Sequence, residues 1–184
     1  MRIFVTVFAL LASCTVERPD LPGFSEIPIE APAAAYEACA SERQDSVRCV
    51  LDGDTFGLSS CTDQNAERIR LLGIDAPEIA HEGVAADCYG DIAAETLNDL
   101  IGNEDVFLTF GDECEDVYGR TLAWVWYFPE DEDEPILVNE WMLRHGHARQ
   151  YEGNSDSLLY LERLENAERS AMEGQLGLWE VCGG

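Results

Sequence analysis

The sequence contains no lysine: all 11 of its basic residues are arginines, set against 37 acidic residues for a formal net charge of −26. It therefore lacks the broad basic field that usually attracts phosphate backbones to a protein surface. Two explanations remain open. In the first, the acidic surface keeps the protein soluble in salty surroundings. A Debye length of roughly 3 to 8 Å then screens the long-range repulsion of an anion, and only the local site binds it. Otherwise, the chain binds no nucleic acid at all.

The sequence also lacks a hydrophobic run long enough for a membrane span. Its N-terminal apolar stretch lies between Arg2 and Cys14 and is too short to cross a hydrocarbon core of roughly 30 Å. One early positive charge followed by apolar and then small residues predicts that residues 1–13 are an export signal. The sequence LASC at 11–14 resembles the lipobox of bacterial lipoproteins, which predicts lipidation of Cys14 and anchoring to the outer membrane or cell surface. The alternative is a plain signal peptide that leaves a periplasmic or secreted protein.

No two cysteines are spaced as C-x-x-C, so a zinc knuckle is a poor fit. Apart from Cys14, six cysteines remain, at positions 39, 49, 61, 88, 114 and 182. An even number in an exported chain predicts disulfides. We favour Cys49 with Cys61 and Cys88 with Cys114, because the second bridge would join two loops that border the candidate site. Two or more free buried thiols are the alternative.

The composition changes after about residue 45. Four of the seven prolines lie between residues 15 and 45 among acidic and small residues, a pattern typical of a semi-extended tether. We therefore predict a signal peptide over 1–13, a lipidated tether over 14–45 and a folded domain over 46–182. No obligate protein partner is inferred.

Hydrophobic periodicity within the domain indicates an α+β fold. The Asp-Gly pair between two short apolar runs predicts a β-hairpin, and strands are expected over 47–51, 55–58, 68–74, 106–110 and 121–127. Apolar residues at helical spacing predict helices over 89–101, 138–145 and 157–172. Strands and helices that follow one another in blocks, without βαβ repeats, are typical of α+β proteins.

Three short runs carry candidate chemistry: DGDT at 52–55, RLLGIDAPE at 70–78 and DVYGR at 116–120. Clustered carboxylates can hold a hard cation, and guanidinium groups fork onto phosphate oxygens. Both are needed to hydrolyse a phosphodiester. Each run alone has a structural explanation, as a hairpin turn, a strand end or a solvated loop. Their joint occurrence in this order is what favours a site.

In this order, the three runs resemble the thermonuclease (staphylococcal-nuclease-like) family. The resemblance implies a five-stranded OB-type β-barrel with about three packed α-helices. It also implies a calcium-dependent nuclease that hydrolyses DNA, with RNA as a further candidate, and leaves 3′-phosphate ends. The implied roles are as follows: Asp54, Asp75 and the carbonyl of Ala76 as Ca²⁺ ligands; Glu78 as general base; Arg70 and Arg120 as phosphate-binding catalytic arginines; Tyr118 and Tyr151 as substrate-binding residues.

The best-known member of the family is basic and supplies lysines and tyrosines around its nucleotide pocket, whereas this chain has no lysine and carries Val117 just before Tyr118. The strong negative charge leaves open a second function, a non-catalytic OB-type module that binds a nucleotide or a protein at the cell surface. A structural lipoprotein whose acidic loops only bind calcium is a third.

Overall fold

The computed structural model describes residues 42–183, except 64, 82, 131–133, 152 and 154–159. All of them belong to one compact unit, Ala31–Gly184. The predicted signal peptide, Cys14, Cys39 and nearly all of the predicted tether lie outside the described residues. Within the described part, no helix combines the length and apolar character needed to span a membrane.

The strands of the described residues are β1 (Arg43–Ser46), β2 (Cys49–Asp52), β3 (Thr55–Gly57), β4 (Arg68–Leu71), β5 (Ile74–Asp75), β6 (Asp105–Thr109), β7 (Thr121–Tyr127), β8 (Ile136–Leu137) and β9 (Arg149–Gln150). The helices are α1 (Gly90–Ile101), α2 (Val138–Arg144), α3 (Leu161–Glu173) and α4 (Leu178–Val181). The predicted α+β class is confirmed. β1 begins before residue 46, where the domain was predicted to start.

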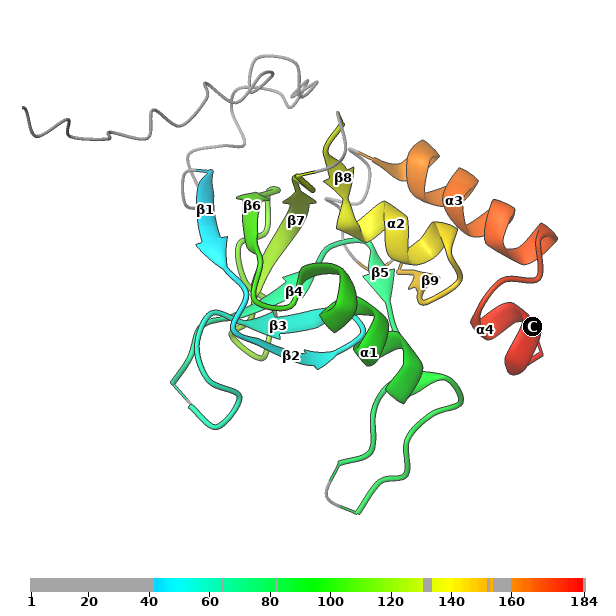
Figure 1. Ribbon diagram of the computed structural model, residues 1–184, viewed down its shortest axis with the longest axis horizontal. Helices are drawn as coiled ribbons and strands as arrows, with labels where there is room; N and C mark the ends of the chain where they lie inside the picture. Colours follow the sequence, from blue (N-terminus) through cyan, green and yellow to red (C-terminus); the bar gives the residue numbers. More distant parts are fainter. Residues whose placement is uncertain are drawn as a thin grey trace, which may run out of the picture. The chain divides into compact units, whose positions relative to one another are not determined.

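Seven strands form one mixed sheet in the order β1-β6-β7-β4-β3-β2, with β8 paired to β7 (Figure 1). All pairs are antiparallel except β4 with β7. The two ends of this path, β1 and β2, follow each other in the chain and are separated only by Val47 and Arg48. Hydrogen bonds do not close the sheet into a barrel within the described residues, so the predicted five-stranded barrel is not what this part of the chain shows. β5 and β9 form a second, two-stranded sheet.

The core lies between this sheet and the helices. β7 is buried along its central residues, and Trp124 in its middle is fully buried. α1 buries Ala93, Leu97 and Ile101, whose spacing of four residues places them on one helix face. The periodic apolar residues that predicted this helix therefore lie on the helix face that packs against the core.

The predicted strand over 68–74 is two strands, because the chain turns between Leu71 and Ile74. Gly73 has φ +71°, a conformation that favours glycine, and an added Cβ would lie 2.6 Å from Leu164 and 3.2 Å from Trp124. The turn redirects the chain, so that β5 pairs with β9 instead of continuing in the large sheet.

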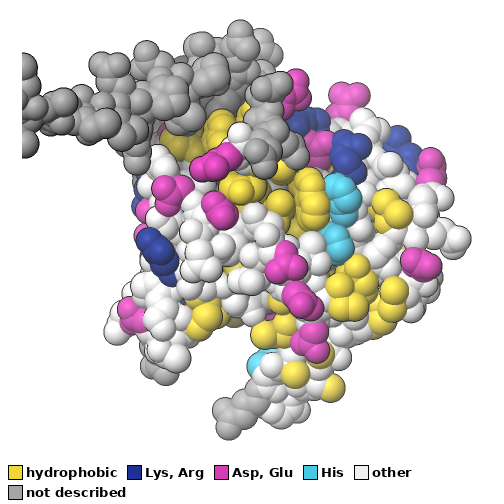
Figure 2. Space-filling view, viewed as in Figure 1, with side chains coloured by type: hydrophobic (Ala, Val, Ile, Leu, Met, Phe, Trp, Pro, Cys, Tyr) yellow, Lys and Arg dark blue, Asp and Glu magenta, His cyan; other side chains and the backbone are white. Residues whose placement is uncertain are grey.

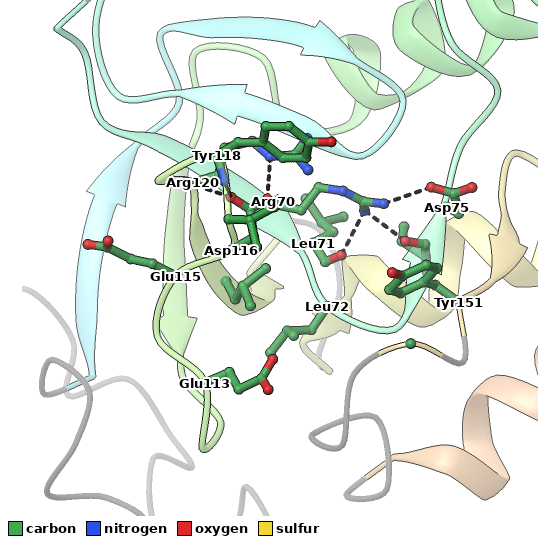
Figure 3. A pocket seen from close by; sticks show the side chains of 14 residues that line it. Arg70, Leu71, Leu72, Asp75, Glu113, Glu115, Asp116, Tyr118, Arg120 and Tyr151 are labelled. Carbon is green, nitrogen blue, oxygen red and sulfur yellow. Dashed lines mark hydrogen bonds and ion pairs between the residues drawn. The ribbon is translucent and has the colours of Figure 1, made fainter.

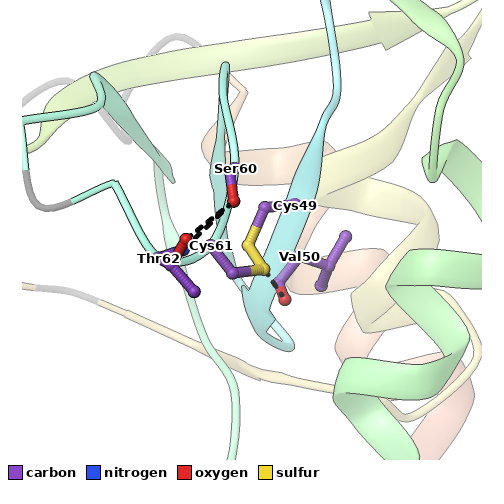
Figure 4. Close-up of a disulfide and its surroundings, with 5 residues drawn as sticks. All are labelled: Cys49, Val50, Ser60, Cys61 and Thr62. Carbon is purple, nitrogen blue, oxygen red and sulfur yellow. Dashed lines mark hydrogen bonds between the residues drawn. A yellow bond between two sulfur atoms is a disulfide. The ribbon is translucent and has the colours of Figure 1, made fainter.

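One predicted disulfide is confirmed and the other is wrong. Cys49 and Cys61 are bonded, with Ser60 and Thr62 beside the bridge (Figure 4). Cys88 is bonded to Cys182, not to Cys114, and their Cα atoms are 5.9 Å apart. The reason is the C-terminal segment: Leu178 and Trp179 are buried, Tyr89 and Cys182 pack against them, and this brings Cys182 beside Cys88. Cys114 is also disulfide-bonded.

Candidate active site

Two of the predicted carboxylates share one guanidinium group. Arg70 Nη1 lies 3.0 Å from Asp54 Oδ2, and Arg70 Nη2 lies 2.9 Å from Asp75 Oδ1. The same guanidinium donates to the carbonyl oxygens of Leu71 and Ile74 at 3.0 and 2.7 Å (Figure 3). The strands explain this geometry, because Thr55 and Arg70 are register partners in the β3–β4 pair and Asp54 immediately precedes Thr55. Arg70 therefore fixes both carboxylates at the start of β3 and the end of β5.

Asp54 is nearly buried, with 5% of its surface exposed. Its Oδ2 accepts a hydrogen bond of 2.7 Å from the Ala76 N–H, and its Oδ1 accepts one of 2.9 Å from the Thr55 hydroxyl. Burial raises the pKa of the Asp54 carboxyl above its ordinary value, against the opposing effect of the Arg70 charge. A further positive charge beside this carboxylate would favour its ionised form.

Gly53 explains how the hairpin reaches Ala76. A Cβ at Gly53 would lie 2.7 Å from the Cβ atoms of both Ala76 and Ala93, so only glycine fits between α1 and the residue that follows β5. This close approach brings the Ala76 N–H onto Asp54. The role predicted for Ala76 used its carbonyl; the contact in the structure uses its N–H.

Arg120 is held by Asp116, a residue whose role the sequence did not reveal. Arg120 Nε donates to Asp116 Oδ2 at 2.6 Å, and Asp116 Oδ1 accepts from the backbone N–H groups of Tyr118 and Arg120. Burial of the Asp116 carboxyl raises its pKa, but hydrogen bonds from the backbone and side chain of Arg120 outweigh this and hold the pKa below its ordinary value. On its other side, Arg120 Nη1 lies 3.4 Å from the hydroxyl of Thr55. Thr55 thus lies between Arg120 and Asp54, and its role was also missed.

Glu78 stands exposed where the chain leaves β5. Its backbone is fixed at both ends: its carbonyl accepts from the Asp87 N–H at 2.9 Å, and its own N–H donates to Asp87 Oδ2 at 3.3 Å. Partial burial raises the pKa of the Glu78 carboxyl above its ordinary value, and the charges of Asp52 and Asp75 raise it further. A carboxylate with a raised pKa is a stronger base than an ordinary one.

The site opens into a cleft of about 550 Å³ whose lining includes Arg70, Asp75 and Arg120. Tyr118 and Tyr151 lie on opposite sides of this cleft (Figure 3). The Tyr118 ring is exposed, with the guanidinium of Arg120 over it at 5.4 Å from the ring centroid. Both predicted substrate-binding tyrosines therefore reach the hollow that the two arginines line.

The chemistry of the donors fits a hard cation. Asp54 and Asp75 supply carboxylate oxygens, and the backbone N–H of Asp54 donates to Asp52 at 3.0 Å, which places a third carboxylate nearby. Ca²⁺ prefers oxygen ligands in flexible geometry. Among the residues that the structure describes, no three acidic, histidine or cysteine side chains are grouped closely enough to hold an ion by themselves. A cation here would take its remaining ligands from carbonyls, water and substrate.

Comparison with known proteins identifies the pattern. The family model described as staphylococcal nuclease homologue matches residues 68–181. A thermonuclease of Staphylococcus intermedius is 34% identical over 136 residues, which cover 73% of this chain and 74% of the relative. Uncharacterized endonucleases of Escherichia coli and Haemophilus influenzae are 35% and 33% identical over 131 and 144 residues. These alignments cover 71% and 77% of this chain and 72% and 70% of the two relatives.

Proposed function

The chain belongs to the staphylococcal nuclease homologue family, and on that premise we propose that it is a calcium-dependent nuclease hydrolysing phosphodiester bonds in DNA, with RNA as a further candidate substrate. The observation that carries this proposal is the convergence of Asp54 and Asp75 on Arg70. Arg120 and both tyrosines line the same cleft. The OB-type barrel of the family is the fold we infer for the sheet, whose two ends are consecutive strands.

Glu78 acts as general base in this proposal. It accepts the proton of a water molecule as the water oxygen attacks phosphorus, and its raised pKa suits that task. Arg70 and Arg120 donate hydrogen bonds to the phosphate oxygens, where negative charge grows in the transition state. A bound Ca²⁺ would supply Lewis-acid stabilisation to the same oxygens, held by Asp54, Asp75 and the Ala76 carbonyl. Breaking the bond to the 5′ oxygen leaves a 3′-phosphate on one product and a 5′-hydroxyl on the other, because the departing oxygen takes a proton from solvent.

Calcium dependence gives the first test. Single-stranded DNA incubated with the purified protein and millimolar Ca²⁺ should yield acid-soluble fragments that a 3′-phosphatase can dephosphorylate. A chelator such as EGTA should abolish their release. The guanidinium of Arg70 is already paired with the carboxylates of Asp54 and Asp75, so it cannot replace the positive charge of the removed Ca²⁺. Excess Ca²⁺ should restore the release. Full activity in chelator, or fragments with 5′-phosphates, would contradict the proposed cofactor or the proposed bond.

The acidic surface predicts an unusual response to salt. Figure 2 shows acidic side chains spread over one face of the molecule, with arginine side chains mainly toward its margins. Because a net charge of −26 repels a polyanion, KM for single-stranded DNA should fall about two- to fivefold as KCl rises from about 10 to about 150 mM and the Debye length shrinks from about 30 to about 8 Å. A model diester with one charge should show a smaller change. A KM that rises steadily over this range would contradict the repulsion argument.

We also propose export and lipid anchoring at Cys14, which rests on the N-terminal sequence alone. Cells given labelled palmitate should incorporate label into the wild-type protein, and Cys14→Ser should remove the label and release the protein from the membrane fraction. Equal labelling of the two would exclude Cys14 as the anchor.

A further inference from the structure

A second hollow lies beside the candidate active site. It has a volume of about 350 Å³ and is lined by Asp75, Ala76, Pro77, Glu78, Asp87, Cys88, Arg149, Leu178 and Cys182. It shares Asp75 with the first cleft. Asp75 therefore stands between a cleft that contains Arg70 and Arg120 and a hollow that contains Arg149, and Glu78 lines the second hollow.

Arg149 is the basic residue that lines this second hollow. The β5–β9 pair sets its place, because Arg149 is the register partner of Asp75. Its guanidinium carbon lies 4.1 Å from the centroid of the Trp179 ring. Trp179 itself is anchored in the C-terminal cluster with Ala171 and Leu178.

Among the residues that the structure describes, the stacking on Trp179 leaves the N–H donors of the Arg149 guanidinium open. Most arginines of this acidic chain that the structure describes pair with carboxylates, as Arg43, Arg70, Arg120, Arg144 and Arg163 do. Within the described residues, the ion pairs do not include Arg149, and Trp179 is the contact that holds it. A guanidinium fixed by its face can direct its N–H donors to a phosphate in a forked pair.

We propose that the second hollow is a subsite for the phosphodiester adjacent to the scissile one, and that Arg149 binds that phosphate. This inference rests on the proposed nuclease function and makes its substrate more specific. The preferred substrate is an oligonucleotide that spans both hollows, with the scissile phosphate near Arg70 and Arg120 and the next phosphate at Arg149. The site then favours bonds that have a neighbouring phosphate over an isolated phosphodiester.

The test compares two substrates: a dinucleotide with one phosphodiester, and the same dinucleotide extended by one nucleotide at each end. Arg149→Gln should raise KM for the extended substrate about tenfold and leave both kcat and the KM of the dinucleotide within about twofold. Arg149→Lys, which keeps the charge but loses the fork, should give an intermediate KM.

Arg169→Gln is the matched control, because it removes the same charge from an exposed residue of α3 that lines neither hollow. It should leave KM unchanged for both substrates. An equal loss on both substrates with Arg149→Gln would mean that the residue acts through β9 and Asp75, and would overturn the subsite. No change on either substrate would also overturn it.

Binding separates this inference from the proposed function. Calorimetry with the extended oligonucleotide in EGTA measures affinity without turnover. Weaker binding by Arg149→Gln than by wild type supports the subsite even if the wild-type protein cleaves neither substrate, a result that would remove the nuclease proposal alone. Equal binding overturns the subsite.

Discussion

Replacing Glu78 by Gln should lower kcat on single-stranded DNA by about 10²- to 10⁴-fold, the range that a general base contributes. The amide keeps the size of the side chain but cannot accept a proton from water. KM should stay within about threefold, because the substrate-binding cleft is lined by Arg70, Arg120 and the two tyrosines instead. Single-turnover cleavage at saturating Ca²⁺ measures the effect on chemistry directly.

The fold should tolerate this change. Glu78 is exposed, and the contacts that fix its position run through its backbone to Asp87. Arg70 is a poorer probe, because its removal would leave the buried Asp54 carboxylate without its ion pair and cost about 3 to 5 kcal/mol of stability. A loss of activity in an Arg70 variant would mix unfolding with chemistry.

Glu95→Gln is the control for charge, since Glu95 is an exposed residue of α1 that lines neither hollow. It should leave kcat unchanged. The pH profile adds a second readout: the rate of the wild type should fall as pH drops through the pKa of Glu78, which lies above the ordinary 4.5, and Glu78→Gln should lose that acid limb. A decrease in kcat of less than tenfold, or the same decrease in Glu95→Gln, would contradict the role of Glu78 as general base.

Local sequence signals predicted those parts of the fold that depend on local chemistry. The Asp-Gly hairpin forms as expected between β2 and β3, because turn residues fix a hairpin within a few positions. α1 begins one residue after the predicted start and ends where expected, because its apolar residues recur at helical spacing. Asp54, Arg70 and Asp75 converge because the hairpin and β4 are neighbours in both sequence and space.

The parts that were missed depend on distant pairing. β9 has only two residues and forms because it pairs with β5. It is too short to show a periodic pattern, so the sequence predicts neither this strand nor the position of Arg149. At the Gly73 turn that separates β5 from β4, distant residues Trp124 and Leu164 leave no room for a Cβ, a constraint that the local sequence does not show. Asp116 holds Arg120 through a tight turn, a contact that an Asp and Arg four residues apart in a loop could have suggested.

The pairing of the cysteines shows most clearly what the sequence could not predict. Cys49 and Cys61 are 12 residues apart, and the β2–β3 hairpin already brings them close, because Cys49 pairs with Gly57 and Cys61 follows four residues later. Cys88 and Cys182 are 94 residues apart, and only the docking of the C-terminal helix joins them. The chosen partner, Cys114, was nearer in sequence but belongs to another loop.

The Cys88–Cys182 bridge should therefore matter for both stability and activity. A double substitution of both cysteines by Ser should lower the free energy of unfolding by about 4 kcal/mol, because the chain-entropy model assigns a closed loop of about 100 residues roughly 4.7 kcal/mol. Double substitution of Cys49 and Cys61 should cost less, about 3 kcal/mol, because the model gives a loop of about 15 residues roughly that amount. Urea unfolding of the two double variants and the wild type measures this order.

Activity should separate the two bridges more sharply than stability does. Cys88 follows Asp87, whose backbone and side chain hold Glu78, and it lines the second hollow. Cleavage of the Cys88–Cys182 bridge frees both this loop and the segment that carries Trp179, so kcat should fall at temperatures where the protein is still folded. Neither cysteine of the Cys49–Cys61 bridge lines the cleft or the second hollow, so loss of this bridge should leave kcat unchanged. Equal kcat in the two folded double variants would show that Glu78 is positioned without help from the C-terminal helix.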